Sequence, residues 1–293
     1  TRSLVVTGVQ TCALPIYGLN QKIKGYTIAD FWTEWAKSIK MPLTKFEKEI
    51  VGRKIIKVKR RAKNILIYLS GGKIMLVHLK MTGHLLVKNK EAKIKNKNFE
   101  ERVNGYIRHS WLLRKGKQKL KLDFSDLRKF GKIELFNEKE LSKHITLSKL
   151  GIEPLSADFT LENFVLALNG KKKSSLHSAL MDQNKIAGIG NIYASEILFE
   201  ARIKPSRKGG TLKKAELKAL YSQIIKVLKK AIKYRGTSDS DYRDVNGAPG
   251  RFQKLLKVYG RTGERCKRKG CAGKIMRQKI GQRSRWLDRK SVV

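Results

Sequence analysis

The pattern of hydrophobic and polar positions changes near residue 149. From Tyr17 to about Ser148, short runs rich in β-branched and aromatic residues alternate with turn residues, which is typical of strands. Gly71-Gly72 lies between two of these runs, NILIYLS and IMLVHLK, and predicts a hairpin. A second hairpin is predicted in SWLLRKGKQKLKLDF, with its turn at 115–117, and a short helix at Leu43–Val51. This part of the chain is therefore predicted to be a sandwich or barrel.

From about Gly151 the spacing becomes helical, in TLENFVLALNG, SSLHSALMD, NIYASEILFEA and LKKAELKALYSQIIKVLKKAIKY. The last segment places apolar residues on one face, which we interpret as core packing, and Thr211 is predicted to cap it. From Gly236 the chain becomes a glycine-rich polar loop, followed by short strands and two cysteines. The predicted fold class is α+β with several domains: a β-sandwich, a helical domain and a small C-terminal hairpin.

Charge indicates the kind of partner. The 293 residues include 66 Lys+Arg against 24 Asp+Glu, a net charge of +42, and the basic runs are spread along the whole chain. Such an excess favours binding to nucleic acid, although a lysine-rich proteome is an alternative explanation. The sequence has no apolar run of about 18 residues, so no membrane span is expected. Three cysteines argue against a secreted disulfide scaffold and favour a reducing cytoplasm.

The two ends of the sequence have an unusual composition. Residues 6–16 (VTGVQTCALPI) and 288–293 (DRKSVV) both back-translate to codons that resemble paired short-read sequencing adapters. We therefore expect residues 1–16 and 288–293 to be adapter-derived, and we expect the chain to be a fragment open at both ends.

The segment MDQNKIAGIGNIYASE carries the first specific motif. Gly188-Ile189-Gly190-Asn191 predicts a tight turn that opens a helix, where free N–H groups and the Asn191 amide could hold a phosphate. A dinucleotide-binding fingerprint is the competing interpretation. It fails because Tyr193 stands where the third glycine would be and no strand precedes the turn.

Several motifs together resemble one family. LMDQNKIAGIGNIYASEILFEARIKP is similar to the helix-two-turns-helix signature of the formamidopyrimidine-DNA glycosylases. RRAKNILI, HLKMTGHL, FSDLRKFG, LGIEPL and NGAPGRFQKLLKVYGRTGERC resemble the same family in the same order, and the resemblance covers roughly Tyr17 to Trp286. It implies a β-sandwich catalytic domain at 17–148, a helix-two-turns-helix DNA-binding domain at 149–236, and a lesion loop with an incomplete zinc hairpin at 237–287.

The resemblance implies roles for individual residues. Lys63 would contact the phosphate beside the lesion and assist β-elimination, whereas a lone strand lysine is usually only solvated. Met81, Arg128 and Phe130 match a triad that fills the hole left by a flipped-out base; taken alone, Met81 and Phe130 would be expected in the core.

Four further positions match the family, and His78 is an additional candidate. Asn191 and Lys173 match residues that bind the DNA backbone, and Arg283 matches an arginine at the hairpin tip that grips phosphates and assists δ-elimination. Glu196 matches a residue near the active site, with a helix-surface position as the alternative. His78, like His109, could be a packed strand histidine, but His78 is predicted to lie close to the site.

Cys266 and Cys271 form a C-x4-C pair, which alone cannot close a tetrahedral zinc site. In the family a second cysteine pair follows, and it would fall where the adapter-like end begins. We expect one structural zinc ion in the parent protein and weak zinc binding with a poorly ordered last ~35 residues in this chain. Cys12 lies in the other adapter-like segment.

The family begins with Met-Pro-Glu, whose proline amine attacks the sugar and whose glutamate protonates it; neither is present in residues 1–16. The implied function is excision of oxidised purines (8-oxoguanine and formamidopyrimidines) with abasic-site lyase activity. The alternatives are an endonuclease-type glycosylase for oxidised pyrimidines and, for this chain without Pro-Glu, a non-catalytic damaged-DNA-binding protein. The expected partner is double-stranded damaged DNA, bound by a monomer in the bacterial cytoplasm, at the nucleoid.

Overall fold

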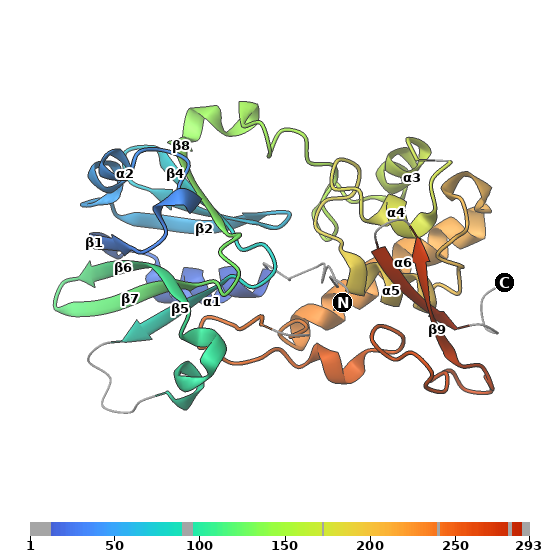
Figure 1. Ribbon diagram of the computed structural model, residues 1–293. Helices are drawn as coiled ribbons and strands as arrows, with labels where there is room; N and C mark the ends of the chain where they lie inside the picture. Colours follow the sequence, from blue (N-terminus) through green and yellow to red (C-terminus); the bar gives the residue numbers. More distant parts are fainter. Residues whose placement is uncertain (1–12, 90–95, 172, 239–240, 281–282, 289–293) are drawn as a thin grey trace. The chain divides into compact units, whose positions relative to one another are not determined.

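The computed structural model describes residues 13–89, 96–171, 173–238, 241–280 and 283–288 (Figure 1). The chain divides into two compact units. Among the described residues, the N-terminal unit contains those from 13 to 148 and from 235 to 251, and the C-terminal unit contains those from 149 to 234 and from 252 to 288. Among the described residues, no helix combines the length and the apolar composition needed to cross a bilayer.

Two four-stranded antiparallel sheets form the N-terminal unit. One sheet has the order β1-β6-β7-β5, from β1 (Thr27–Thr33), β5 (His84–Asn89), β6 (Ile107–Lys115) and β7 (Gln118–Ser125). The other has the order β2-β3-β4-β8, from β2 (Ile55–Arg61), β3 (Asn64–Leu69), β4 (Lys73–His78) and β8 (Lys132–Asn137). Helices α1 (Ala13–Ile23) and α2 (Leu43–Ile50) accompany them, with short 3-10 turns at Ala36–Ser38, Lys97–Glu100, Arg102–Asn104 and Glu138–Lys143.

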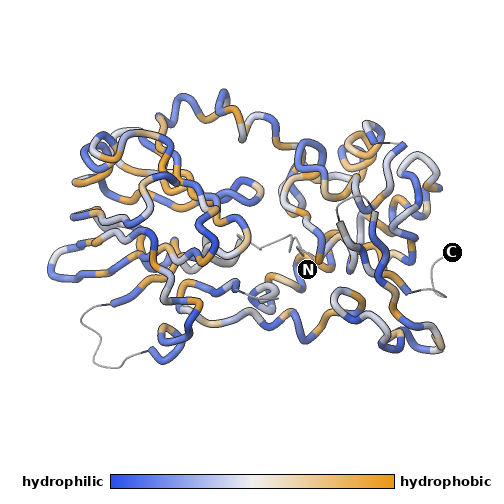
Figure 2. Tube along the Cα trace, in the orientation of Figure 1, coloured by the Kyte–Doolittle hydropathy of each residue, from blue (hydrophilic) through white to orange (hydrophobic). Residues whose placement is uncertain are grey.

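The two sheets and both helices share one hydrophobic core, which includes Ile23, Phe46, Ile67, Val77 and Trp111. This arrangement confirms the predicted strands, both hairpins and the helix at residue 43. Gly71 and Gly72 have φ values of 72° and 66°, a conformation that side chains disfavour, so the β3–β4 turn requires glycine. The hairpin tip between β6 and β7 is hydrophilic (Figure 2), as its lysines and arginines dictate.

The C-terminal unit is mainly helical. It contains α3 (Leu161–Asn169), α4 (Leu176–Leu180), α5 (Asn191–Glu200) and α6 (Lys214–Lys233), 3-10 turns at Gly209–Thr211 and Phe252–Leu255, and a hairpin of β9 (Ile275–Ile280) and β10 (Arg283–Asp288). The apolar face of α6 packs into the core around α5 as expected. The predicted cap at Thr211 is wrong: the N-cap is Lys213, whose backbone N–H donates to Glu216 Oε2 at 2.8 Å.

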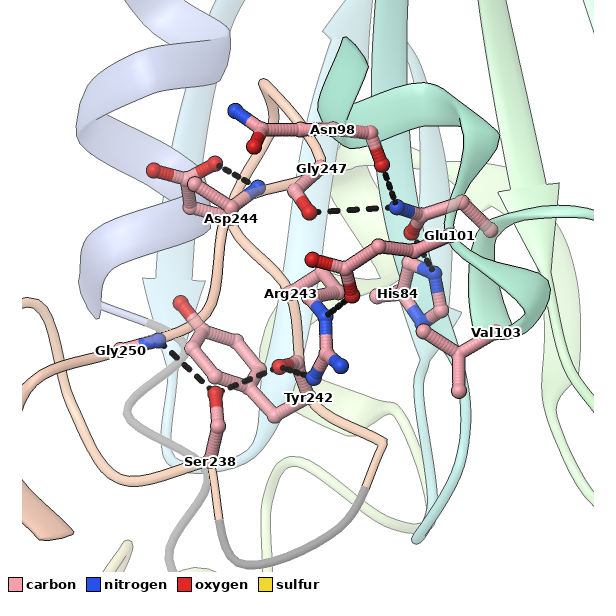
Figure 3. Close-up of polar contacts among 12 residues, drawn as sticks. His84, Asn98, Glu101, Val103, Ser238, Tyr242, Arg243, Asp244, Gly247 and Gly250 are labelled. Atoms are coloured by element: carbon pink, nitrogen blue, oxygen red, sulfur yellow. Dashed lines mark hydrogen bonds and ion pairs between the residues drawn. The ribbon is translucent and has the colours of Figure 1, made fainter.

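The glycine-rich segment Arg235–Arg251 packs on the N-terminal unit, although the helices precede it in sequence. Arg243 Nε donates to Glu101 Oε2 at 2.7 Å, and Asn104 Nδ2 donates to the Gly247 carbonyl at 3.1 Å (Figure 3). Val87 N also donates to the Val245 carbonyl at 2.9 Å, next to β5. This segment is therefore held by side chains and backbone groups from two parts of the sheet domain.

Two buried histidines make the N-terminal unit sensitive to acid. His109 is fully buried, and its two ring nitrogens lie 2.8 Å from Thr33 Oγ1 and 2.8 Å from Ser38 Oγ. His84 is 1% exposed and lies 2.8 Å from Asn104 Oδ1. Burial lowers the pKa of both histidines to about 4. The packed-strand alternative for His109 is therefore confirmed.

These shifts predict the direction of the pH dependence. A histidine whose pKa is lower in the folded state stabilises the fold fully above its unfolded pKa of about 6.5, and that stability is lost as the pH falls towards 4. The loss between pH 6.5 and 4.5 is about 2–3 kcal/mol per histidine. Denaturant unfolding followed by tryptophan fluorescence should show a smaller acid-induced loss in His109→Gln than in the unsubstituted protein. An unchanged loss would contradict this assignment.

Candidate functional site

Two loops at neighbouring strand ends bring three of the predicted residues together. Met81 follows β4, whereas Arg128 and Phe130 lie between β7 and β8. Arg128 Nη1 lies 3.9 Å from Met81 Sδ, and the Arg128 guanidinium lies 4.8 Å from the centre of the Phe130 ring. Phe130 is 52% exposed, so it projects from the surface instead of filling the core. An exposed aromatic beside an arginine and a thioether can contact both faces and edges of a base.

A buried carboxylate organises both loops. Asp126 is 1% exposed; it accepts the Thr82 hydroxyl, and its Oδ2 accepts the Gly131 N–H at 2.7 Å. Arg128 N lies 3.2 Å from Thr82 Oγ1 and 3.3 Å from Asp126 Oδ1. The sequence analysis did not identify Asp126 or Thr82. Their signal is a short polar side chain within two residues of Met81 or Arg128, a pattern that alone indicates only a turn.

Lys63 lies on the turn between β2 and β3, where Ala62 has a φ of 52°. Asn64, the next residue, pairs with His78 across β3 and β4, so Lys63 and His78 lie at the same end of these two strands. His78 Nδ1 accepts the Lys80 N–H at 3.0 Å. Burial, followed by the charges of Lys80 and Lys63, lowers the pKa of His78 to about 3, so this imidazole is neutral at physiological pH. The structure thus places the two predicted residues next to each other.

In the C-terminal unit, Asn191 is the first residue of α5 and follows the N-cap Gly190, as the motif predicts. The side chain of Asn191 is 3% exposed, and its Oδ1 has no hydrogen-bond partner within the described parts of the chain. Lys173 lies exposed in the turn before α4. The backbone of Arg283 begins β10, and its side chain lies outside the described residues.

Glu196 has a different environment from the one expected. It is 2% exposed, so the helix-surface alternative is wrong. Its Oε1 accepts the N–H groups of Val258 and Tyr259, and its Oε2 accepts that of Lys257, each at 2.9 Å. Burial raises the pKa of Glu196, and these three N–H bonds oppose the rise. The carboxylate therefore fixes the segment 257–259, whose Tyr259 ring lies 4.2 Å from that of Trp286 on β10.

The cysteine pair has a third candidate ligand. Potential ligand atoms of Cys266, Cys271 and Asp288 all lie within 4.8 Å of one another, and Cys271 Sγ lies 3.0 Å from Asp288 Oδ2. Burial and the hydrogen bond with Asp288 raise the pKa of Cys266 to about 11. Two thiolates and a carboxylate are suitable zinc donors, and within the described residues they supply three of the four ligands that a structural site uses.

The class of protein follows from comparison with known sequences. Residues 13–133 match the formamidopyrimidine-DNA glycosylase N-terminal domain, and residues 150–242 match the formamidopyrimidine-DNA glycosylase H2TH domain. The first match begins at residue 13, where α1 also begins, so both cross the predicted native start at residue 17, which stays a prediction.

Whole-chain relatives agree with the domain matches. The formamidopyrimidine-DNA glycosylases of Carboxydothermus hydrogenoformans and Pelotomaculum thermopropionicum are 39% and 37% identical over 91% of this chain, covering 92% and 91% of those proteins. The chain belongs to the formamidopyrimidine-DNA glycosylase family. Its structure is similar to that of Lactococcus lactis Fpg in complex with DNA containing an abasic site, with a TM-score of 0.84 and 26% identity over 97% of this chain and 99% of that one.

The geometry of Glu196 predicts a structural effect of its replacement. Glu196→Gln should lower the free energy of unfolding of the C-terminal unit by about 1–3 kcal/mol, because the new amide N–H group faces a backbone donor. Denaturant unfolding measures this change. Glu200→Gln on the same helix is a suitable control, since Glu200 is only partly buried and pairs with Lys257 at 2.7 Å. Equal stability of the two variants would contradict a role in fixing residues 257–259.

Proposed function

We propose that this protein, when its chain begins with the family's Pro-Glu pair, removes oxidised purines, such as 8-oxoguanine and formamidopyrimidines, from duplex DNA and cleaves the resulting abasic strand. The observation that carries the proposal is the cluster of Met81, Arg128 and the exposed Phe130, assembled from two loops. The family membership and the similarity to Lactococcus lactis Fpg bound to abasic-site and Fapy-dG DNA support it.

The cluster can perform the step that base excision requires. A base inside a duplex cannot be attacked, so it must leave the stack, and the vacated space must be filled. Phe130 would wedge into the neighbouring base step and Met81 would occupy the hole, because both are apolar and lie at the surface end of the sheets. Arg128 would then hydrogen-bond the orphaned base of the undamaged strand.

Around this cluster, Lys63 would hold the phosphate beside the lesion and assist β-elimination. His78 lies next to it and is neutral, so Lys63 and Lys80 carry the positive charge at this end of the strands. Lys173 and Asn191 would bind the DNA backbone, Asn191 through the helix N-terminus where it stands. Arg283 would grip phosphates and assist δ-elimination. The side chain of Glu196 would act by positioning residues 257–259.

The nucleophile is the point at which this sequence departs from the family. No Pro-Glu pair occurs in residues 1–16, so we infer that the chain as it stands binds damaged DNA without forming the covalent intermediate. A chain in which those residues are replaced by the family's Met-Pro-Glu start would carry the proline amine. At a terminal-amine pKa of about 8, much of that amine is neutral and can attack the sugar carbon.

We assign base preference to the segment Gly236–Phe252, whose residues up to Arg251 belong to the N-terminal unit (Figure 3). A preference for oxidised pyrimidines is the alternative, since a structure of Lactococcus lactis Fpg also holds DNA containing an oxidised pyrimidine. Residues 239–240 of this segment lie outside the described residues. We propose that the chain acts as a monomer in the bacterial cytoplasm, at the nucleoid.

We also propose that Cys266 and Cys271 hold one structural zinc ion in the parent protein. The two sulfur atoms approach each other at the base of the β9–β10 hairpin, where a metal would join the loop 266–271 to the strands. Bound zinc would make the hairpin rigid, because a small hairpin of this kind gains much of its folding energy from the metal. In this chain Asp288 stands next to the cysteine pair. Two thiolates and one carboxylate would hold zinc less tightly than four cysteine ligands.

Borohydride trapping tests the proposed reaction. The chain as it stands should bind duplex DNA containing an abasic site but should form no covalent adduct. The chain with a restored Pro-Glu start should be trapped, because only that chain has the N-terminal proline amine beside the glutamate. Electrophoresis of the borohydride-treated mixtures measures the adduct. Efficient trapping of the unrestored chain, or none of the restored chain, would contradict the proposal.

Substitutions in the cluster test the wedge. Phe130→Ala and Arg128→Ala in the restored chain should each weaken binding to abasic-site duplex by about 1–3 kcal/mol, roughly 5- to 150-fold in Kd, while the fold is kept. Trp32→Ala is a matched control, since Trp32 is also 52% exposed but lies on β1. Fluorescence anisotropy with labelled duplexes gives the affinities. The wedge assignment fails if both cluster variants bind as the control does.

A further inference from the structure

A basic pocket of about 490 Å³ lies on the N-terminal unit and shares Phe130 with the cluster described above. Phe130 and Trp35 are its aromatic walls. Arg128 and Met81 are not among its lining residues. Five lysines line it: Lys37, Lys40, Lys80, Lys129 and Lys132.

Positive charge in the basic pocket is only partly compensated. Lys40 Nζ lies 2.8 Å from Glu134 Oε1, and Lys129 Nζ lies 3.7 Å from Glu34 Oε1. Glu34 also pairs with Arg108, so it is shared between two cations. The pKa of Lys80 is lowered, first by burial and then by the charges of Lys132 and Lys40. Lysines that repel one another around an open cavity favour an anionic occupant.

The aromatic walls narrow the class of anion. Lys129 Nζ lies 4.7 Å from the centre of the Trp35 ring, and Lys37 Nζ lies 5.8 Å from it. A flat aromatic surface flanked by ammonium groups suits a nucleotide, because the base can stack while the phosphate meets the charges. A small inorganic anion would use the lysines but would not need the aromatic rings.

The wall that carries Trp35 is fixed from beneath. Trp35 N donates to Thr33 Oγ1 at 3.0 Å, and Ser38 Oγ donates to the Trp35 carbonyl at 3.0 Å. His109, fully buried, connects Thr33 and Ser38 through its two ring nitrogens. The pocket is thus held in shape without any ligand, which lowers the entropic cost of binding.

We propose that the basic pocket binds the phosphates of the undamaged strand next to the orphaned base. This inference rests on the proposed function, in which Arg128 contacts that base. Phe130 joins the two features: one side of its ring meets the Arg128 guanidinium, and the residue also lines the pocket. The nucleotides that neighbour the orphaned base would therefore reach Lys37 and Lys40, with one base against Trp35. The lesion strand would remain with Lys63.

The test uses charge removal on both molecules. Lys37→Gln/Lys40→Gln is compared with Lys117→Gln/Lys119→Gln, which removes two exposed lysines from the β6–β7 hairpin. The DNA is a duplex with a tetrahydrofuran abasic-site analogue, carrying neutral methylphosphonates beside the orphaned base, beside the lesion, or nowhere. Anisotropy titrations across a range of salt concentrations give Kd for each pair.

We expect Lys37→Gln/Lys40→Gln to weaken binding about tenfold or more at 0.1 M salt and to reduce the salt slope by about 1.8, since each phosphate contact contributes about 0.9. Methylphosphonates in the undamaged strand should abolish the difference between this variant and the unsubstituted chain. The proposal is overturned if the difference persists with that duplex, if methylphosphonates in the lesion strand remove it instead, or if the hairpin control behaves identically. Loss of the unsubstituted chain's preference for abasic-site over undamaged duplex would reject the proposed function separately.

Discussion

The surface cluster of Met81, Arg128 and Phe130 depends on the hydrogen bonds that the Asp126 carboxylate accepts. It is buried and accepts hydrogen bonds from the Thr82 hydroxyl and the Gly131 N–H, so it joins the loop after β4 to the loop before β8. Met81 and Phe130 belong to different loops, and neither has enough local structure to fix its position alone. A buried ionic acceptor strengthens such bonds, and losing one partner would leave a costly uncompensated charge. The buried carboxylate of Asp126 therefore positions the exposed ring of Phe130.

The C-terminal unit uses the same device. Glu196 is buried on α5 and accepts three successive backbone N–H groups of the segment 257–259. Tyr259 of that segment packs against Trp286 on β10, so the segment also helps to position the hairpin that ends beside the cysteines. In both units a buried carboxylate fixes a segment of backbone, and Glu196 is the one that the sequence suggested as a residue near the active site. The helical spacing around Glu196 could not show this, because the backbone N–H donors lie 61 to 63 residues further along the chain.

Regular elements were predictable from the sequence because their signals are local. Alternation identified the strands, Gly71-Gly72 the hairpin, and helical spacing α3 to α6. The cap of α6 was missed because Lys213 uses its backbone and Glu216 instead of a capping hydroxyl. The return of Arg235–Arg251 to the N-terminal unit was not predictable either. It depends on single pairs such as Arg243 with Glu101, which no periodicity reveals. The implied roles of the individual site residues stay predictions.

The lysines of the basic pocket destabilise the free protein by mutual repulsion, but the same charge favours binding of an anion. Five lysines around one cavity repel one another, and the pKa of Lys80 is lowered first by burial and then by the charges of Lys132 and Lys40. Within the described residues, Glu134 pairs with Lys40 and Glu34 pairs with Lys129, so these two carboxylates compensate only part of the positive charge, and we propose that a bound polyanion would stabilise the pocket. The fully buried His109 supports the same wall and is neutral at physiological pH, so it adds rigidity without adding to the repulsion. A net charge of +42 would attract nucleic acid to the whole surface, and we propose that the shaped pocket beside Phe130 adds a preference for one of the two strands.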